Sequence, residues 1–182
     1  LQCISRDLMR EMDVLGQIPI EGFGYLIDTE HGRFGSWISF MHYVFAEGIK
    51  SAKSSPLLPN ELLEAIEVIG THLERFSYSG PPSLCWGDIS PENIILDKKD
   101  KFVGLIDFEG VLAVDKQLNH GYLRARYADS KFWLAFNLQW HANSSLESAR
   151  SALYVIVRAL RILPHVHEPL PTGTRRLPID QF

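Results

Sequence analysis

Residues 86–93 read WGDISPEN, and residues 106–109 read IDFE. SGPP at 79–82 ends a helical pattern, and three short segments rich in Ile, Leu, Val and Phe follow, SLCWGD, NIILD and FVGLIDFEG. They predict short β-strands in hairpin order between about residues 83 and 110, with the polar DKKDK at 97–101 as the turn between the second and the third. The hairpin would bring Asp107 beside the loop that carries Asp88 and Asn93.

The spacing of these polar residues points to a specific chemistry. An aspartate followed five positions later by an asparagine, and then by Asp-Phe on the far strand of a hairpin, is the order of the catalytic loop and metal ligands in kinases. Phosphoryl transfer needs a carboxylate that positions a hydroxyl and accepts its proton, and oxygen ligands that hold Mg²⁺ against the nucleotide phosphates. The alternative is that Asp88 and Asn93 only cap turns and Asp107 only ends a strand. The joint match favours phosphotransferase ancestry.

With these motifs the chain resembles the aminoglycoside phosphotransferase and choline kinase-like family of the protein-kinase-like superfamily. The loop of that family reads His-Gly-Asp-x-x-x-x-Asn and is followed by Ile-Asp-[Phe/Trp]-Glu. The resemblance implies that Asp88 is the catalytic base, that Asn93 and Asp107 hold Mg²⁺ and thereby the nucleotide, and that Glu109 contacts the metal through water. It also implies ATP and Mg²⁺ as cofactors, and as substrate a small-molecule alcohol similar to an aminoglycoside or choline.

The chain departs from the family pattern in two places. Trp86 stands where the family has histidine, and an indole offers one hydrogen-bond donor and no acceptor, so the bracing of the loop is expected to change. The family's aspartate-containing segment after Asp-Phe-Glu is not recognisable, so neither Asp115 nor Asp129 receives a role.

The nucleotide-binding half of the family pattern is absent from the sequence. GFGYL at 22–26, followed by Ser36-Trp37, resembles the family's stretch just after the junction of its two lobes. Gly22 and Gly24 lack the third glycine and the following lysine-bearing strand of a phosphate loop, so they predict a turn. We therefore expect the ATP-binding small lobe to lie in about a hundred further residues before Leu1.

Apolar residues at spacings of three and four predict the helices. The pattern indicates helices over residues 1–16, from Ser36 as N-cap through Phe45, over 60–76, over 129–139 and over 145–163. The inward stripe of the 60–76 helix includes Leu62, and that of the last helix begins at Leu146. From Pro164 onward, four prolines and no apolar period predict an extended tail over 164–182.

Composition limits the classes of function. Hydrophobic residues make up 46% of the 182 residues, charged residues 22%, and the net charge is −4. These values fit a globular chain with an adequate core, without a general attraction to nucleic acid, and the longest apolar run is too short for a bilayer. Two cysteines, Cys3 and Cys85, form neither a disulfide framework nor a metal motif, which favours the cytoplasm, and Cys85 is expected in the core of a strand.

The predicted fold class is α+β and mainly helical. Residues 1–163 would form the large C-terminal lobe of a protein-kinase-like fold, with its β-hairpins at about 83–110. The predicted function is ATP- and Mg²⁺-dependent phosphoryl transfer to a hydroxyl of a small molecule, by a longer protein of which this chain is the catalytic and substrate lobe. Two alternatives stay open: a non-catalytic kinase-like binding module, and a metal-dependent hydrolase with Asp88, Asp107 and Glu109 as ligands.

Overall fold

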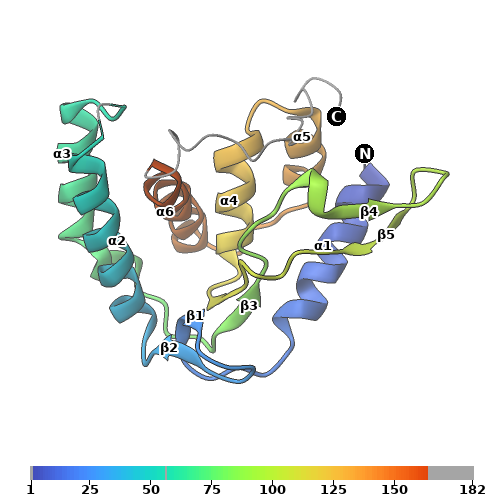
Figure 1. The fold of residues 1–182 in the computed structure, drawn as a ribbon, viewed down its shortest axis with the longest axis horizontal. Coiled ribbons are helices and arrows are strands. Elements are labelled where there is room, and N and C mark those ends of the chain that lie inside the picture. The colour runs from blue at the N-terminus through green and yellow to red at the C-terminus, as the bar shows by residue number, and fades with distance from the viewer. Residues whose placement is uncertain (1, 56, 164–182) are drawn as a thin grey trace.

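The computed structural model describes residues 2–55 and 57–163 (Figure 1). The predicted tail, 164–182, lies outside the described residues. The predicted mixed and mainly helical fold class is confirmed: the described residues form mostly helices, with two small antiparallel sheets. The helices are α1 (Gln2–Gly16), α2 (Trp37–Lys53), α3 (Asn60–Gly70), α4 (Gln117–Tyr127), α5 (Lys131–Asn137) and α6 (Ser145–Ile162), with short 3₁₀ helices η1 (Leu73–Phe76) and η2 (Pro91–Asn93).

The strands form two separate sheets. One has the order β2-β1-β6-β3, from β1 (Phe23–Leu26), β2 (Gly32–Phe34), β3 (Ser83–Cys85) and β6 (Leu112–Val114). The other is the hairpin of β4 (Ile94–Leu96) and β5 (Phe102–Leu105), with residues 97–101 as its turn. Figure 1 shows this hairpin projecting past α1, on the side of the molecule away from α2 and α3.

The predicted β4–β5 hairpin and its turn are confirmed, but the predicted pairing of the first strand was wrong. β3 pairs with β6, in the register Ser83 with Val114 and Cys85 with Leu112, and does not pair with β4. The reason is that residues 86–93 turn away from β3 and start a new sheet. β1, β2 and β6 were not predicted. Gly22 and Gly24 have φ values of 71° and 86°, so both use the positive φ that was predicted, but Gly24 lies within β1 and the turn predicted for it was wrong.

Most predicted helices are present, with corrections at three places. Ser36 caps α2 by accepting a hydrogen bond from the backbone N–H of Ser39, as predicted. The expected helix over 60–76 ends at Gly70 instead, because the Thr71 hydroxyl bonds to the Val68 carbonyl and η1 follows a break. Leu62 in α3 and Leu146 in α6 are exposed by 49% and 40%, so the inward positions predicted for them were wrong. The 129–139 prediction corresponds to the shorter α5, capped by Ser130.

Two clusters of buried side chains hold these elements together. The larger lies between α2, α6 and the four-stranded sheet, and there the Trp37 indole donates to the Tyr154 hydroxyl at 2.6 Å. The second joins α1, α4 and α5 to the loop after β3, and its buried members are Leu8, Met12, Trp86, Ile89, Leu123, Tyr127, Phe132, Trp133 and Phe136. The loop carrying the motif is therefore anchored in a core of its own. Among the described residues, no helix is long and apolar enough to cross a membrane.

A buried ion pair joins the start of α4 to α6. Arg150 Nε donates to Asp115 Oδ2, and the two side chains are exposed by only 7% and 2%. Asp115 Oδ1 also accepts from the backbone N–H of Gln117 at 3.1 Å. Asp115, for which the sequence suggested no role, thus connects α4 to α6.

We predict that Arg150→Met lowers the free energy of unfolding by about 3–5 kcal/mol, because it leaves the Asp115 carboxylate buried without its partner. The double variant Asp115→Asn/Arg150→Met removes both charges but keeps an acceptor for the backbone N–H of Gln117. Its free energy of unfolding should therefore fall clearly less than that of Arg150→Met. Denaturant unfolding of the two variants tests this. Equal losses in both would contradict the assignment of the cost to an unpaired charge.

Candidate active site

Trp86 ties the motif loop to the segment that follows β5. Its side chain is fully buried, and its indole Nε1 donates to the backbone carbonyl of Asp107 at 3.0 Å. The Trp86 ring also lies against the Phe108 ring, with centroids 6.3 Å apart. The replacement of the family histidine was expected to change the brace of the loop. The single donor of the indole provides one hydrogen bond between the two halves of the motif.

Two glycines allow these segments to touch. A Cβ added to Gly87 would lie 2.0 Å from the carbonyl oxygen of Gly110, a distance at which the backbones must move apart. A Cβ on Gly110 would lie 3.1 Å from the Cβ and the backbone nitrogen of Asp88. Because neither glycine has a side chain, the two backbones can approach each other, and Asp88 lies next to the turn that follows Asp107.

Asn93 forms the second link. Its Nδ2 donates to the backbone carbonyl of Asp88 at 3.3 Å, and its own carbonyl accepts from the backbone N–H of Ile106 at 3.0 Å. These two bonds close the loop at one end and attach it to the end of β5 at the other. The Asn93 Oδ1 remains available as an oxygen ligand.

Asp107 has an unusual backbone conformation. Its φ is 63°, in the left-handed region that a non-glycine residue seldom adopts, and its side chain is exposed. Glu109 is exposed in the next turn. In residues 2–55 and 57–163, neither carboxylate has a hydrogen bond or an ion pair, and no group of three or more His, Cys, Asp or Glu residues is placed to hold a metal ion.

Asp88 lies between this segment and the helices α4 and α6. Its Oδ1 accepts a hydrogen bond from Arg158 Nη2 at 3.1 Å, and Arg126 Nη1 lies 3.8 Å from the same oxygen. Arg126 Nη2 is also 3.9 Å from Glu92 Oε2. The Asp88 side chain keeps 42% of its surface exposed, so a small molecule can reach it.

The structure therefore brings together three of the four residues singled out from the sequence. The side chains of Trp86 and Asn93 donate to the main-chain carbonyls of Asp107 and Asp88, which joins these residues. Glu109 lies in the turn beside them without a contact of its own. Sequence reasoning missed Arg126 and Arg158. Arg158 carried a weak signal, as a charged residue within the strongly periodic helix α6, but α4 itself was not predicted.

Cys85 is a core residue, as expected. It is fully buried in β3, and burial raises the pKa of its thiol far above the usual range, which disfavours the thiolate that a nucleophile needs.

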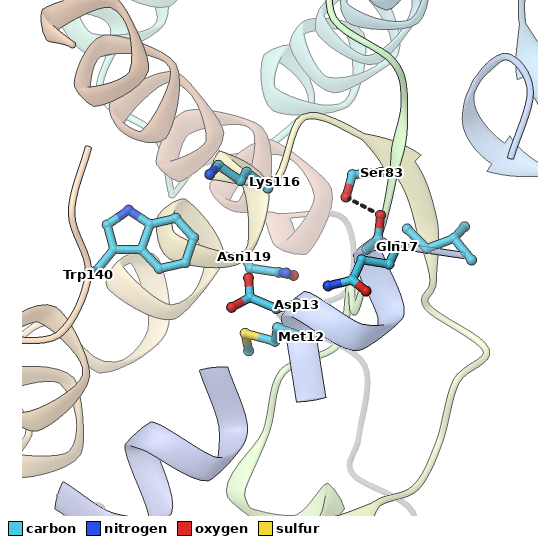
Figure 2. Close-up of a pocket in the computed structure, with 9 residues that line it drawn as sticks. Met12, Asp13, Gln17, Ser83, Lys116, Asn119 and Trp140 are labelled. Atoms are coloured by element: carbon cyan, nitrogen blue, oxygen red, sulfur yellow. Dashed lines mark hydrogen bonds between the residues drawn. The ribbon is translucent and has the colours of Figure 1, made fainter. Parts of the chain in front are cut away.

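A separate pocket of about 240 Å³ lies between the end of α1, β3 and the start of α4. Figure 2 shows Asp13 of α1 and Gln17, which follows α1, around it, together with Lys116, Asn119 and the Trp140 ring. None of the residues singled out from the sequence lines it. We therefore place the candidate active site at the loop, and not in this pocket.

We predict that Gly87→Ala destabilises the fold by about 1–3 kcal/mol, because the added methyl group meets backbone and not a movable side chain. Gly104→Ala is the matched control, because Gly104 lies in β5 and nothing is within 4 Å of an added Cβ. Its free energy of unfolding should change by no more than about 0.5 kcal/mol. Chemical unfolding of both variants gives the comparison. A Gly87→Ala variant as stable as wild type would show that the two segments do not touch.

We predict that Asp107→Gly raises the free energy of unfolding by about 0.5–1 kcal/mol, because glycine adopts positive φ without the cost that a Cβ imposes. The control Asp129→Gly, at an exposed position without positive φ, should be neutral or destabilising. Thermal and denaturant unfolding measure both. If Asp107→Gly destabilised the protein as much as Asp129→Gly, the left-handed conformation of Asp107 would be incorrect.

Comparison with known proteins agrees with the motif. Residues 27–113 match the model of a family described as the phosphotransferase enzyme family. No curated protein sequence matches the chain. Among solved structures, an apo thermostable mutant of aminoglycoside phosphotransferase APH(4)-Ia has a TM-score of 0.68 at 13% identity, covering 90% of this chain and 57% of its own.

Two further structures have the same fold. A mutant of the same enzyme in a ternary complex with AMP-PNP and hygromycin B has a TM-score of 0.65 at 14% identity, over 90% of this chain and 57% of that one. A putative fructosamine-3-kinase from Haemophilus somnus has a TM-score of 0.63 at 15% identity, over 94% of this chain and 60% of that one. The chain thus spans about three fifths of the length of these structures.

The family match includes the motif at residues 86–109, and the structural matches extend over nearly the whole chain. The predicted resemblance is confirmed: over residues 27–113 the chain is similar to the phosphotransferase enzyme family, and it has the fold of the aminoglycoside phosphotransferase and fructosamine kinase structures.

Proposed function

We propose that this chain is the large, catalytic lobe of a longer phosphotransferase that uses ATP and Mg²⁺ to phosphorylate a hydroxyl of a small molecule. The family match and the shared fold support phosphoryl transfer, and the coverage of about three fifths of the related structures supports a second, nucleotide-binding lobe elsewhere in the protein. Cys3 and Cys85 are free thiols, which is compatible with the proposed cytoplasmic location.

One observation carries the proposal more than any other. Trp86 bonds to the Asp107 carbonyl and Asn93 bonds to the Asp88 carbonyl, so the three polar residues of the motif are fixed relative to one another. Turn capping alone would account for the local bond of Asn93, five residues from Asp88, but not for the bond of Trp86 to Asp107, twenty-one residues away. Pre-organised polar groups of this kind are the main contribution that a protein makes to phosphoryl transfer.

Asp88 is the proposed catalytic base. Its half-exposed carboxylate would accept a hydrogen bond from the substrate hydroxyl, orient the oxygen and take up its proton as the bond to phosphorus forms. Arg158 donates to Oδ1 of this carboxylate, which would leave Oδ2 for the substrate hydroxyl. The contact fixes the carboxylate in one orientation, and this favours a reactive arrangement of base and hydroxyl.

Asn93 and Asp107 are the proposed Mg²⁺ ligands, with Glu109 acting through water. The donor set fits this ion, because Mg²⁺ in such enzymes is held by one or two protein oxygens together with the nucleotide phosphates and water. The Asp107 carboxylate is exposed and has no partner among the described residues, and the Asn93 amide nitrogen is the atom engaged by Asp88. When bound, the ion would neutralise negative charge on the transferred phosphoryl group.

The two alternative functions have less support. A metal-dependent hydrolase would need a cluster of carboxylate ligands, and the described part of the chain has no group of three acidic, His or Cys residues placed to hold a metal. A non-catalytic module was suggested by the loss of the family histidine. The hydrogen bond from Trp86 to Asp107 favours a site whose geometry is retained.

The experiment uses the full-length protein that contains this chain and measures Mg²⁺-dependent ATP consumption with a panel of small hydroxyl compounds. Asp88→Asn should lower turnover by about a hundredfold or more, because the amide cannot accept the proton, while folding is unchanged. Asp129→Asn is the matched control, as an exposed aspartate away from the motif, and should retain wild-type turnover.

Chelation of Mg²⁺ should abolish turnover in both the wild type and the Asp129→Asn variant. Wild-type turnover by Asp88→Asn would remove Asp88 from its proposed role. A panel in which no hydroxyl compound supports ATP consumption, although the protein binds Mg²⁺-ATP, would favour the non-catalytic alternative.

A further inference from the structure

Three arginines gather on one side of the Asp88 carboxylate. Arg158, in α6, donates to Asp88 Oδ1 at 3.1 Å, and Arg126, in the last turn of α4, lies 3.8 Å from the same atom. Arg161, one turn after Arg158, donates to the Tyr122 hydroxyl at 3.0 Å. The guanidinium groups of Arg158 and Arg161 both lie over the Tyr122 ring, at 5.2 and 5.9 Å from its centroid.

The acidic groups close to these arginines do not balance their charge. Among the described residues, Asp88 and Glu92 are the carboxylates in contact with Arg126 and Arg158, and Arg161 adds a third positive charge without an ion pair to either. The contacts of Arg126 with both carboxylates are long, at 3.8 and 3.9 Å, and leave its donors available. The Arg158 side chain is exposed by only 14%, so water screens its charge poorly.

The arginines lie on the side of the loop where a phosphoryl acceptor would bind. Asn93 and Asp107 come from the segments that flank the β4–β5 hairpin, whereas the arginines come from α4 and α6. In Figure 1 the loop between β3 and β4 runs between α4 and the hairpin, so helix and hairpin are on opposite sides of it. A nucleotide held at the hairpin side leaves the helix side of Asp88 for the second substrate.

We propose that the acceptor substrate of this site is an anionic hydroxyl compound, whose carboxylate or phosphate group binds Arg126 and Arg158 while its hydroxyl faces Asp88. Guanidinium groups bind carboxylate and phosphate through paired hydrogen bonds, and a half-buried arginine pair would repel the ammonium groups of an aminoglycoside. The overall charge of −4 does not decide this, because charges beyond about 8 Å are largely screened at physiological salt.

This inference rests on the proposed phosphotransferase function, but the two can fail separately. Binding is measured first, without ATP, by calorimetry on the full-length protein. The probes share one carbon skeleton and differ in charge: D-gluconate and D-glucose 6-phosphate are anionic, D-glucose is neutral, and D-glucosamine is cationic. At least one anionic probe should bind about tenfold or more tightly than glucosamine, and the stronger of the two anions identifies the preferred group.

Variants locate the effect. Arg158→Gln and Arg126→Gln should each reduce anion affinity about tenfold or more and remove the preference over glucosamine. Arg158→Lys retains the positive charge and should keep part of the preference. Arg124→Gln is the control, because Arg124 is an exposed arginine in the same turn of α4 as Arg126 without a contact to Asp88, and its affinities should match wild type.

Equal or tighter binding of glucosamine, or binding of none of the probes, would overturn the anionic substrate class. ATP consumption with the same probes separates the two proposals. Turnover with cationic or neutral probes alone would leave the phosphotransferase in place and reject the anionic acceptor. Anion binding that depends on Arg158, without turnover of any probe, would support the anion site and count against the catalytic function.

Discussion

The hydrogen bond from the Trp86 indole to the Asp107 carbonyl is the interaction on which the candidate site depends. It is formed inside the second core cluster, where α1, α4 and α5 enclose the indole, so the cost of leaving the carbonyl unpaired would be high. Because the bond ends on the backbone of Asp107, it fixes the main chain and leaves the carboxylate free. Packing of the core is thereby connected directly to the position of a proposed metal ligand.

The same connection explains why the site tolerates strain. Asp107 has positive φ, and Gly87 touches Gly110 with no room for a methyl group. The positive φ of Asp107 costs free energy of folding, and the close contact of Gly87 with Gly110 excludes larger residues at both positions. Together they bring Asp107 and Asp88 close to each other. Strained backbone of this kind persists when the surrounding structure over-determines it, as the buried indole and the Asn93 bonds do here.

The sequence was sufficient for the parts that depend on local pattern. The spacing of Asp88, Asn93 and Asp107 predicted their association, and the apolar periodicity predicted α1, α2 and α6. It was not sufficient where contacts are long-range. The pairing of β3 with β6 joins residues about thirty positions apart across strands of three residues, which carry too little pattern to recognise. Arg126 and Arg158 approach Asp88 only because α4 and α6 pack together, and no local signal records that packing.

The charge around Asp88 and the net charge of the chain lead to different expectations for the charge of the acceptor substrate. A net charge of −4 would favour a cationic substrate, yet the surroundings of Asp88 on the helix side carry an excess of arginine. For the proposed acceptor the nearby groups decide, because a molecule bound at Asp88 would meet the arginine donors, whereas distant carboxylates are screened. The fold by itself does not set the substrate, so the proposed choice of acceptor rests on the side chains around Asp88.

We propose that the bond of Trp86 to Asp107, together with the bonds of Asn93 to Asp88 and Ile106, holds Asn93 and Asp107 in place as one metal-binding site. The most direct test of this proposal is paramagnetic broadening of nuclear magnetic resonance signals by Mn²⁺, used in place of Mg²⁺. We predict that the Asn93 side-chain amide and the Trp86 indole N–H broaden at Mn²⁺ concentrations that leave the indole signals of Trp37, Trp133 and Trp140 unchanged. Equal broadening of all four indoles, or an unaffected Asn93 amide, would contradict the account.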